Sequence, residues 1–250
     1  MAARPIPKTS DQPPSPEAVP FKGIYKEAFQ FLRDLKKHND RDWFRERKHV
    51  YEEKLRRPME ALLRESAALA RKRGFPLYVK DKNPVTRIYR DIRFSADKTP
   101  FHTFLGGTLR GAPPTSAHGE VYIHVTFGEP FVAAGYWMPE RPFLQAWREQ
   151  MTRNPKEFSQ VLKALERSKL EWLEGYALKR MPKGFEQQAA TPLESYFKKQ
   201  VFIVRERLTE RDIGSPAVVA RIATFALAAR PLLEYGWRLN YARKRDMLEE

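Results

Sequence analysis

The chain has 250 residues, of which 42% are hydrophobic and 12% aromatic, enough to bury a large core within one domain. It contains no cysteine, which excludes disulfides, thiolate metal sites, iron–sulfur ligation by cysteine and a cysteine nucleophile. Forty-six Lys and Arg residues against 31 Asp and Glu residues give a formal net charge of +15, which attracts anionic metabolites and nucleic acids.

The first twenty residues are rich in proline and poor in large apolar side chains, so residues 1–20 are expected to form a flexible tail. The N-terminus lacks the apolar core of a secretory signal, and no run approaches the roughly 20 apolar residues of a membrane helix. We therefore expect a cytoplasmic protein without membrane association, in which residues 21–250 form a single folded domain.

Helices are predicted directly after the tail. A helix that packs one face on a core is indicated by the i, i+3, i+4, i+7 spacing of Ala28, Phe31, Leu32 and Leu35. Asp40 can cap a second, longer helix that ends at Gly74, and Pro58 should kink this helix or begin a new one. Trp43, in its first turn, is interpreted as a structural core anchor between helix and sheet.

A block of strands follows, with β-branched and aromatic residues between turn signals at residues 87–94, 103–110, 120–127 and 131–137. Short connections between these strands predict an antiparallel meander. The pair Gly106-Gly107 is interpreted as a bulge, or as a place where a ligand approaches the backbone.

The pattern then returns to helices, first at residues 142–151. The segment Asn154–Glu157 has an N-cap Asn, a first-turn Pro and a Glu in the position of a capping box. A short strand at 201–204 and a helix opened by Pro216 complete the chain. Helices on either side of a strand block predict an α+β fold, an antiparallel meander packed by N-terminal and C-terminal helices.

The most informative segment covers residues 87–101, where charged side chains alternate with apolar ones inside a predicted strand. Ionised groups on a strand must face water, a partner or a ligand. With a period of two, one face of this strand carries Arg87, Tyr89, Asp91 and Arg93. The polar face of the strand at 120–127 carries Glu120, Tyr122, His124 and Thr126.

If these two faces point the same way, they form an anion-binding surface. Arg side chains would bind a phosphate or carboxylate, while His124, with a pKa near neutrality, and Asp91 are the candidate catalytic, proton-transferring groups. The predicted ligand-binding side chains are Arg87, Tyr89, Arg93, Lys98 and Tyr122. The alternative interpretation is a solvent-facing surface of salt bridges, in which Asp91 only pairs with Arg93 or Arg87.

Arg90 lies among apolar positions of the same predicted strand, so its guanidinium needs an acceptor if it is buried. A structural ion pair with Asp97, or with Asp42 of an early helix, is the favoured interpretation, and a ligand contact is the second.

The sequence predicts neither a metal site nor a cofactor. Glu120 and His124 share a strand face but are four residues apart, about 13 Å in an extended strand, which is too far for one ion. A Walker loop, a dinucleotide-binding fingerprint, a Gly-x-Ser-x-Gly elbow and a His-Glu-x-x-His helix are all missing from the sequence.

The chain resembles a known family. The segment from Arg87 to Phe101, with Trp43-Phe44, His124, Trp137-Met-Pro139 and Asn154-Pro-x-Glu-Phe158, is similar to the widespread bacterial family called domain of unknown function 2461. The resemblance extends over about residues 25–233. Because this family has no established activity, the resemblance supports the fold prediction and implies no particular reaction.

Three functional hypotheses follow. The leading one is a protein that binds a phosphorylated or carboxylated small molecule on the polar sheet face, either as a binding protein or as an enzyme. The second is a nucleic-acid-binding protein that uses its net charge of +15. The third is a non-catalytic interaction module whose proline-rich tail and basic helices dock an acidic partner. The sequence leaves these three, and the oligomeric state, open.

Overall fold

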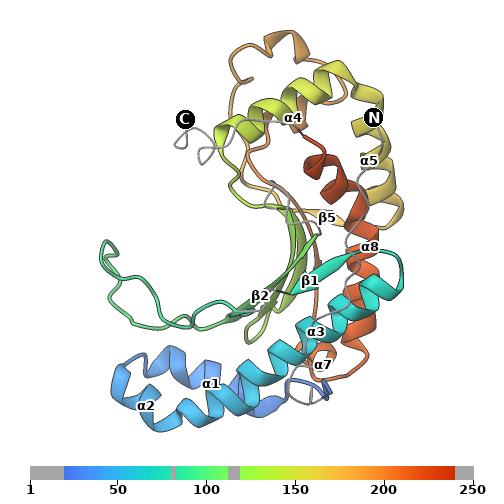
Figure 1. Ribbon diagram of the computed structural model, residues 1–250. Helices are drawn as coiled ribbons and strands as arrows, with labels where there is room; N and C mark the ends of the chain where they lie inside the picture. Colours follow the sequence, from blue (N-terminus) through green and yellow to red (C-terminus); the bar gives the residue numbers. More distant parts are fainter. Residues whose placement is uncertain (1–19, 80–82, 112–118, 240–250) are drawn as a thin grey trace, which may run out of the picture.

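The computed structural model describes residues 20–79, 83–111 and 119–239 (Figure 1). The predicted tail, except Pro20, lies outside these described residues. The helices are α1 (Lys26–Lys37), α2 (Arg41–Val50), α3 (Arg57–Lys72), α4 (Arg141–Arg153), α5 (Pro155–Arg167), α6 (Glu194–Lys198), α7 (Glu210–Ile213) and α8 (Val218–Trp237). A π-helical segment, η1 (Tyr51–Arg56), joins α2 to α3, and a 3-10 turn, η2 (Glu186–Gln188), precedes α6. Within the described residues, no helix combines the length and apolar character needed to cross a membrane.

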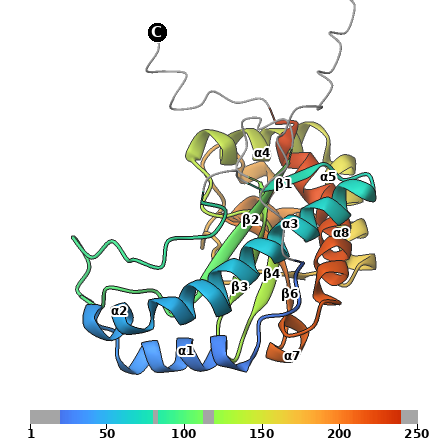
Figure 2. The ribbon, with the colours of Figure 1, turned by 60° about the horizontal axis from the view of Figure 1, so that its bottom comes forward.

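The strands are β1 (Leu77–Val79), β2 (Leu105–Gly111), β3 (Glu120–Val125), β4 (Phe131–Tyr136), β5 (Glu171–Trp172) and β6 (Phe202–Arg207). They form one antiparallel six-stranded sheet in the order β1-β2-β3-β4-β6-β5. The first four strands are a meander, and helices from both ends of the chain pack on the sheet (Figure 2). The predicted α+β fold is therefore confirmed.

One face of the sheet supplies the core. In β3 the alternate residues Val121, Ile123 and Val125 are fully buried. They face the layer formed by α3 and α8, whose apolar side chains belong to the same core cluster. Burying an aliphatic side chain of this size contributes about 2 kcal/mol, so this alternation fixes which face of each strand turns inward.

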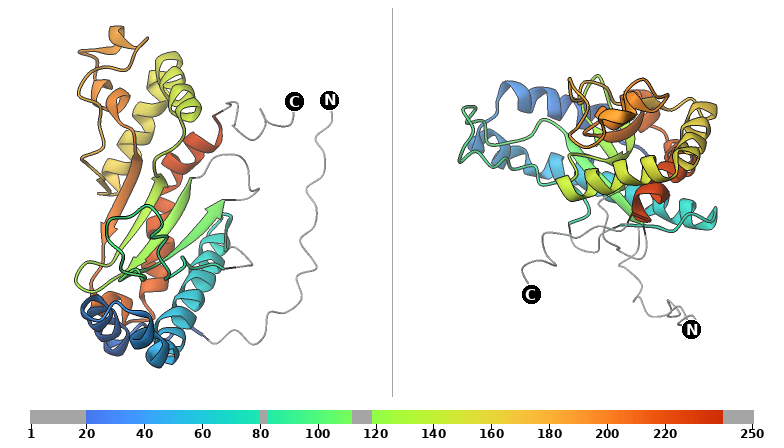
Figure 3. Two further views of the ribbon diagram at one scale, coloured as in Figure 1. Left: turned by 90° about the vertical axis from the view of Figure 1, so that its left-hand side faces the viewer. Right: turned by 90° about the horizontal axis from the view of Figure 1, so that it is seen from above.

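The opposite face is concave and points away from α3 and α8, and Figure 3 (left) looks onto it. We call it the open sheet face. The strand registers place the following side chains on it: Thr108, Tyr122, His124, Phe131, Ala133 and Arg205.

The predicted long helix up to Gly74 consists of α2, η1 and α3. Asp40 Oδ1 accepts hydrogen bonds from the backbone N–H groups of Asp42 (3.0 Å) and Trp43 (2.8 Å), which confirms the predicted cap. Pro58 lies in the first turn of α3 and has no N–H, and just before it the Arg57 N–H donates to Glu52 O with π-helical spacing. Gly74 ends α3 with φ +81°, as predicted.

The strand predicted at residues 87–94 is wrong. Residues 86–104 leave the sheet and form a projection that we call the arm (Figure 1). Its two sides pair with each other, since Arg90 N–H donates to Pro100 O (2.9 Å) and His102 N–H donates to Ile88 O (2.8 Å). A strand in the sheet would have turned Arg90 toward the apolar helix layer, where an ionised group is costly.

The bulge predicted at Gly106-Gly107 is also wrong, because β2 pairs with β3 in unbroken register from Leu105 to Arg110. The two glycines instead permit close packing on both faces of the sheet. A β-carbon at Gly106 would overlap the Tyr122 hydroxyl, and one at Gly107 would overlap the side chain of Leu63 on α3.

Gly135 provides a test of how β4 and β6 pack. Its φ is +136°, and a β-carbon there would overlap the carbonyl oxygen of Phe202 on β6. We expect Gly135→Ala to lower the free energy of unfolding by about 3 kcal/mol, since backbone strain and steric overlap add. Gly128→Ala is the matched control: φ is +87° there, no atom lies within 4 Å of its β-carbon, and only about 1 kcal/mol should be lost. Equal losses in urea denaturation would contradict this account of Gly135.

Candidate anion-binding site

Two of the predicted site residues form a pair at the centre of the open sheet face. Tyr122 and His124 are alternate residues of β3, and the phenol oxygen lies 3.0 Å from His124 Nδ1. Tyr122 donates this hydrogen bond when the imidazole carries its proton on Nε2. The missing side chain at Gly106, opposite His124 on β2, leaves room for the Tyr122 ring.

Aromatic rings surround the imidazole. His124 stacks on Phe131 of β4, with ring centroids 4.6 Å apart and an interplanar angle of 15°, and lies 4.6 Å from the ring of Phe104 at the base of the arm. Burial lowers the pKa of His124 to about 4 and raises the pKa of Tyr122 to about 12. The ordinary imidazole pKa expected from the sequence is therefore not what this site provides, and both groups are neutral at physiological pH.

Arg205 is a site residue that the sequence did not identify. Ala133 of β4 pairs with Tyr122 on one side and with Arg205 of β6 on the other, so these three side chains form one row across the open sheet face. Arg205 Nε is buried and has no hydrogen-bond partner among the described residues. The predicted strand ended at residue 204, one position too early to include Arg205, and alternation would otherwise have placed it on this face.

The charged residues predicted for the site lie elsewhere. Asp91 and Arg93 form an exposed ion pair on the arm, with Nη2–Oδ2 2.7 Å and Nε–Oδ1 3.0 Å, and this pairing lowers the pKa of Asp91. Lys98 is exposed on the arm, and its ammonium donates to Ile92 O (3.1 Å). Asp91 and Arg93 thus form a solvent-facing ion pair, as the alternative interpretation of the sequence described. The structure does not bring these three residues to the Tyr122–His124 pair, because the arm leaves the sheet.

Tyr89 also lies away from the open sheet face. It is 52% exposed, and its ring contacts Phe44 of α2 (5.9 Å between centroids) and Phe101 (5.2 Å). Arg87 is exposed near the start of the arm. Asn39 fixes this part of the arm to the helices, since its amide donates to Phe101 O and accepts from Phe101 N–H, both at 3.0 Å.

The three residues predicted to be structural make their contacts on the arm and the helices. Arg90 Nη1 donates to Asp97 Oδ2 (2.6 Å) and to Thr99 O (3.0 Å), so Asp97 is its partner. Trp43 is partly buried and packs on Phe31 of α1, with ring centroids 5.6 Å apart. It therefore packs between α1 and α2.

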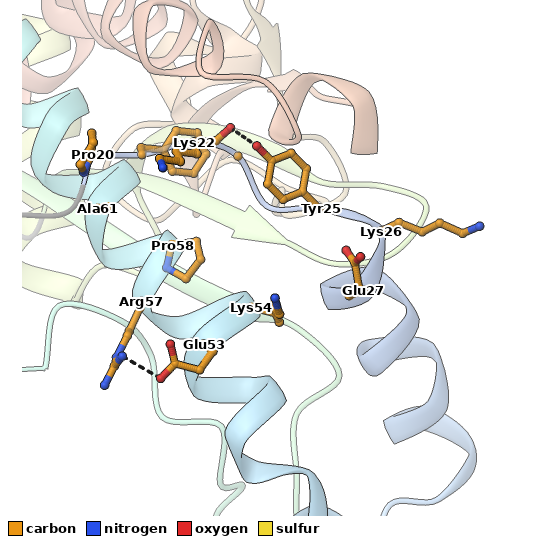
Figure 4. A pocket seen from close by; sticks show the side chains of 12 residues that line it. Pro20, Lys22, Tyr25, Lys26, Glu27, Glu53, Lys54, Arg57, Pro58 and Ala61 are labelled. Atoms are coloured by element: carbon orange, nitrogen blue, oxygen red, sulfur yellow. Dashed lines mark hydrogen bonds and ion pairs between the residues drawn. The ribbon is translucent and has the colours of Figure 1, made fainter.

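A hollow of the surface, with a volume of about 620 Å³, lies between residues 20–27 and residues 53–61 (Figure 4). The Tyr25 hydroxyl donates to Lys22 O (2.7 Å) in its wall, and Arg57 pairs with Glu53 (2.7 Å). Its charged side chains are all exposed, so water satisfies them without a ligand. For this reason we place the candidate site on the open sheet face.

In the three described stretches of chain, no group of three or more His, Asp or Glu side chains is placed to hold a metal ion. His118, which precedes β3 in the sequence, lies outside those stretches.

Comparison with known proteins identifies a family without assigning an activity. Residues 27–235 match the model of a family described as conserved hypothetical protein (DUF2461). No curated protein and no solved structure matches the chain. The family resemblance suggested by the sequence motifs is thus confirmed over most of the chain.

The lowered pKa of His124 makes stability depend on pH. At pH values between the ordinary imidazole pKa of 6.5 and the folded-state pKa of about 4, the unfolded chain binds a proton at His124 and the folded chain does not. We therefore expect the free energy of unfolding to fall as the pH is lowered from about 6.5 to about 4. His124→Asn should remove this part of the slope in urea denaturation, and His49→Asn on the exposed side of α2 is the matched control. An unchanged slope in His124→Asn would refute the assignment.

Proposed function

We propose that this chain, which belongs to the DUF2461 family of conserved hypothetical proteins, binds a phosphate- or carboxylate-bearing small molecule on its open sheet face. The observation that carries the proposal is Arg205, whose buried Nε has no acceptor among the described residues. A buried donor without an acceptor costs about 1–3 kcal/mol, and an oxyanion would supply the acceptor.

The neighbours of Arg205 on the β4 side suit a ligand with a polar part and an apolar part. Ala133 is small and separates Arg205 from Tyr122, which leaves a shallow floor between two larger side chains. The ring of Phe131 adds apolar surface, and the neutral Tyr122–His124 pair adds hydrogen-bonding capacity without charge. An imidazole with a pKa of about 4 is a weak base, so the geometry supports binding more directly than proton transfer at neutral pH.

The net charge of +15 would increase the rate at which anions reach this surface. The proposal includes the cytoplasmic location expected from the sequence, because phosphorylated or carboxylated metabolites occur in the cytoplasm. It also includes the single folded domain expected from the sequence.

A second candidate function, binding of single-stranded nucleic acid, is favoured by one observation. Trp137, just after β4, is 55% exposed and contacts the ring of Tyr176, 37% exposed, in an edge-to-face arrangement with centroids 5.1 Å apart. Exposed aromatic rings on a basic protein are where unpaired bases stack.

The first proposal is tested with Arg205→Met, which keeps an apolar stem and removes every donor. In a thermal-shift screen of sugar phosphates, nucleotides and carboxylates, a ligand of the wild type should raise its melting temperature. Its affinity, measured by calorimetry, should fall at least about tenfold in Arg205→Met, since a hydrogen bond to a charged group contributes about 1.5–3 kcal/mol. Arg211→Met on α7 is the control, because Arg211 is exposed and lies outside the sheet, and it should change affinity little. Equal affinity of Arg205→Met and wild type would disprove the proposal.

The second candidate is tested by titrating a fluorescent single-stranded oligonucleotide at low and at physiological salt. Binding should weaken steeply with salt and should decrease in Trp137→Ala. No measurable binding at low salt would eliminate this function.

A further inference from the structure

A cavity on the other side of the molecule from the arm has features of a second binding site. It lies between α4, α5 and the end of α8 and has a volume of about 310 Å³. Its lining is mostly polar and comprises Ala146, Glu149, Gln150, Arg153, Glu157, Tyr235, Arg238 and Leu239. None of these residues belongs to the open sheet face, so the two sites can be tested separately.

The carboxylate of Glu157 holds the three helices together at this cavity. The sequence predicts that Glu157 completes a capping box with Asn154, and Asn154 Oδ1 does accept from the Glu157 N–H (3.3 Å). The Asn154 N–H, however, already donates to Gln150 O (2.8 Å), so it does not need the carboxylate. Glu157 instead accepts from Gln150 Nε2 (2.8 Å) and from Arg238 Nη2 (2.9 Å). Both of its oxygens are thus occupied by donors of the protein.

The donors at the cavity are not all matched in this way. Tyr235 is 1% exposed, and its buried hydroxyl has no hydrogen-bond partner among the described residues. Tyr235 lines the cavity, and burial raises the pKa of its hydroxyl. The hydroxyl is therefore protonated and can donate a hydrogen bond at physiological pH. Arg153, exposed at the rim, forms no ion pair within the described residues.

We propose that this cavity binds the oxyanion group of a small ligand, a carboxylate or a phosphate, which accepts a hydrogen bond from the Tyr235 hydroxyl and pairs with Arg153. The lining carries two carboxylates, Glu149 and Glu157, and two guanidinium groups, Arg153 and Arg238, and Glu157 is paired with Arg238 at 2.9 Å, so the cavity presents no net negative charge to an oxyanion. A volume of about 310 Å³ lies at the lower end of the range of ligand pockets, so the ligand is small.

The test uses the full chain and two probes, inorganic phosphate and succinate, titrated by calorimetry in a buffer free of other oxyanions. Tyr235→Phe removes one hydroxyl and leaves the ring packing intact. We expect the affinity for at least one probe to fall about tenfold or more in Tyr235→Phe and in Arg153→Met. Without ligand, the melting temperature of Tyr235→Phe should be unchanged or higher, because an unsatisfied buried polar group is removed.

Arg205→Met separates this site from the open sheet face. Binding that is retained in Arg205→Met and lost in Tyr235→Phe supports the cavity. Binding that is lost in Arg205→Met and unchanged in Tyr235→Phe, or no binding of either probe at millimolar concentration, overturns the inference. The preferred probe then tells a phosphate from a carboxylate ligand.

Discussion

The burial of only one face of the sheet is the constraint on which the rest of this structure depends. Val121, Ile123 and Val125 must lie against the helix layer, and because a strand has a period of two, Tyr122 and His124 must then lie on the opposite face. A preference for water does not explain this position, since both side chains are largely buried among aromatic rings. The free energy of the core thus positions the candidate site, and the site needs no binding partner to be assembled.

Two neighbouring glycines connect the core to the site. Gly107 allows Leu63 of α3 to press against one face of β2, and Gly106 allows Tyr122 to lie against the other. The position of α3 thus depends on Gly107, and the position of the phenol depends on the adjacent Gly106. The arm, in contrast, is held by its own bonds between Arg90 and Asp97 and by Asn39. The site and the arm are therefore organised by different interactions, although they are joined through Phe104.

Local signals predicted much of the fold. Asp40 and Gly74 mark the ends of helices, and alternation over residues 120–127 predicts the inward face of β3, because caps and periods depend only on near neighbours. Alternation at residues 87–94 was misleading, since it cannot tell a strand of the sheet from an arm that pairs with itself. Arg205 was missed because the predicted strand ended one residue before it. Its burial depends on the register with Ala133. The sequence likewise cannot show that Phe104 and Phe131 enclose His124 from two directions and lower its pKa.

Charge alone does not distinguish functional cations in so basic a chain. Arg93 and Arg57 have carboxylate partners and are exposed, so removing a ligand from their surroundings would leave nothing unsatisfied. Arg205 and Tyr235 differ because each holds a buried donor that no acceptor of the described chain meets. A fold that keeps such a donor loses about 1–3 kcal/mol relative to one that pairs it, and a bound oxyanion returns that free energy as affinity. Ser66 Oγ and Trp147 Nε1 are also buried and unmatched among the described residues. Arg205 and Tyr235 are selected because their unmatched donors belong to the open sheet face and to a cavity lining, and not because of the excess of positive charge.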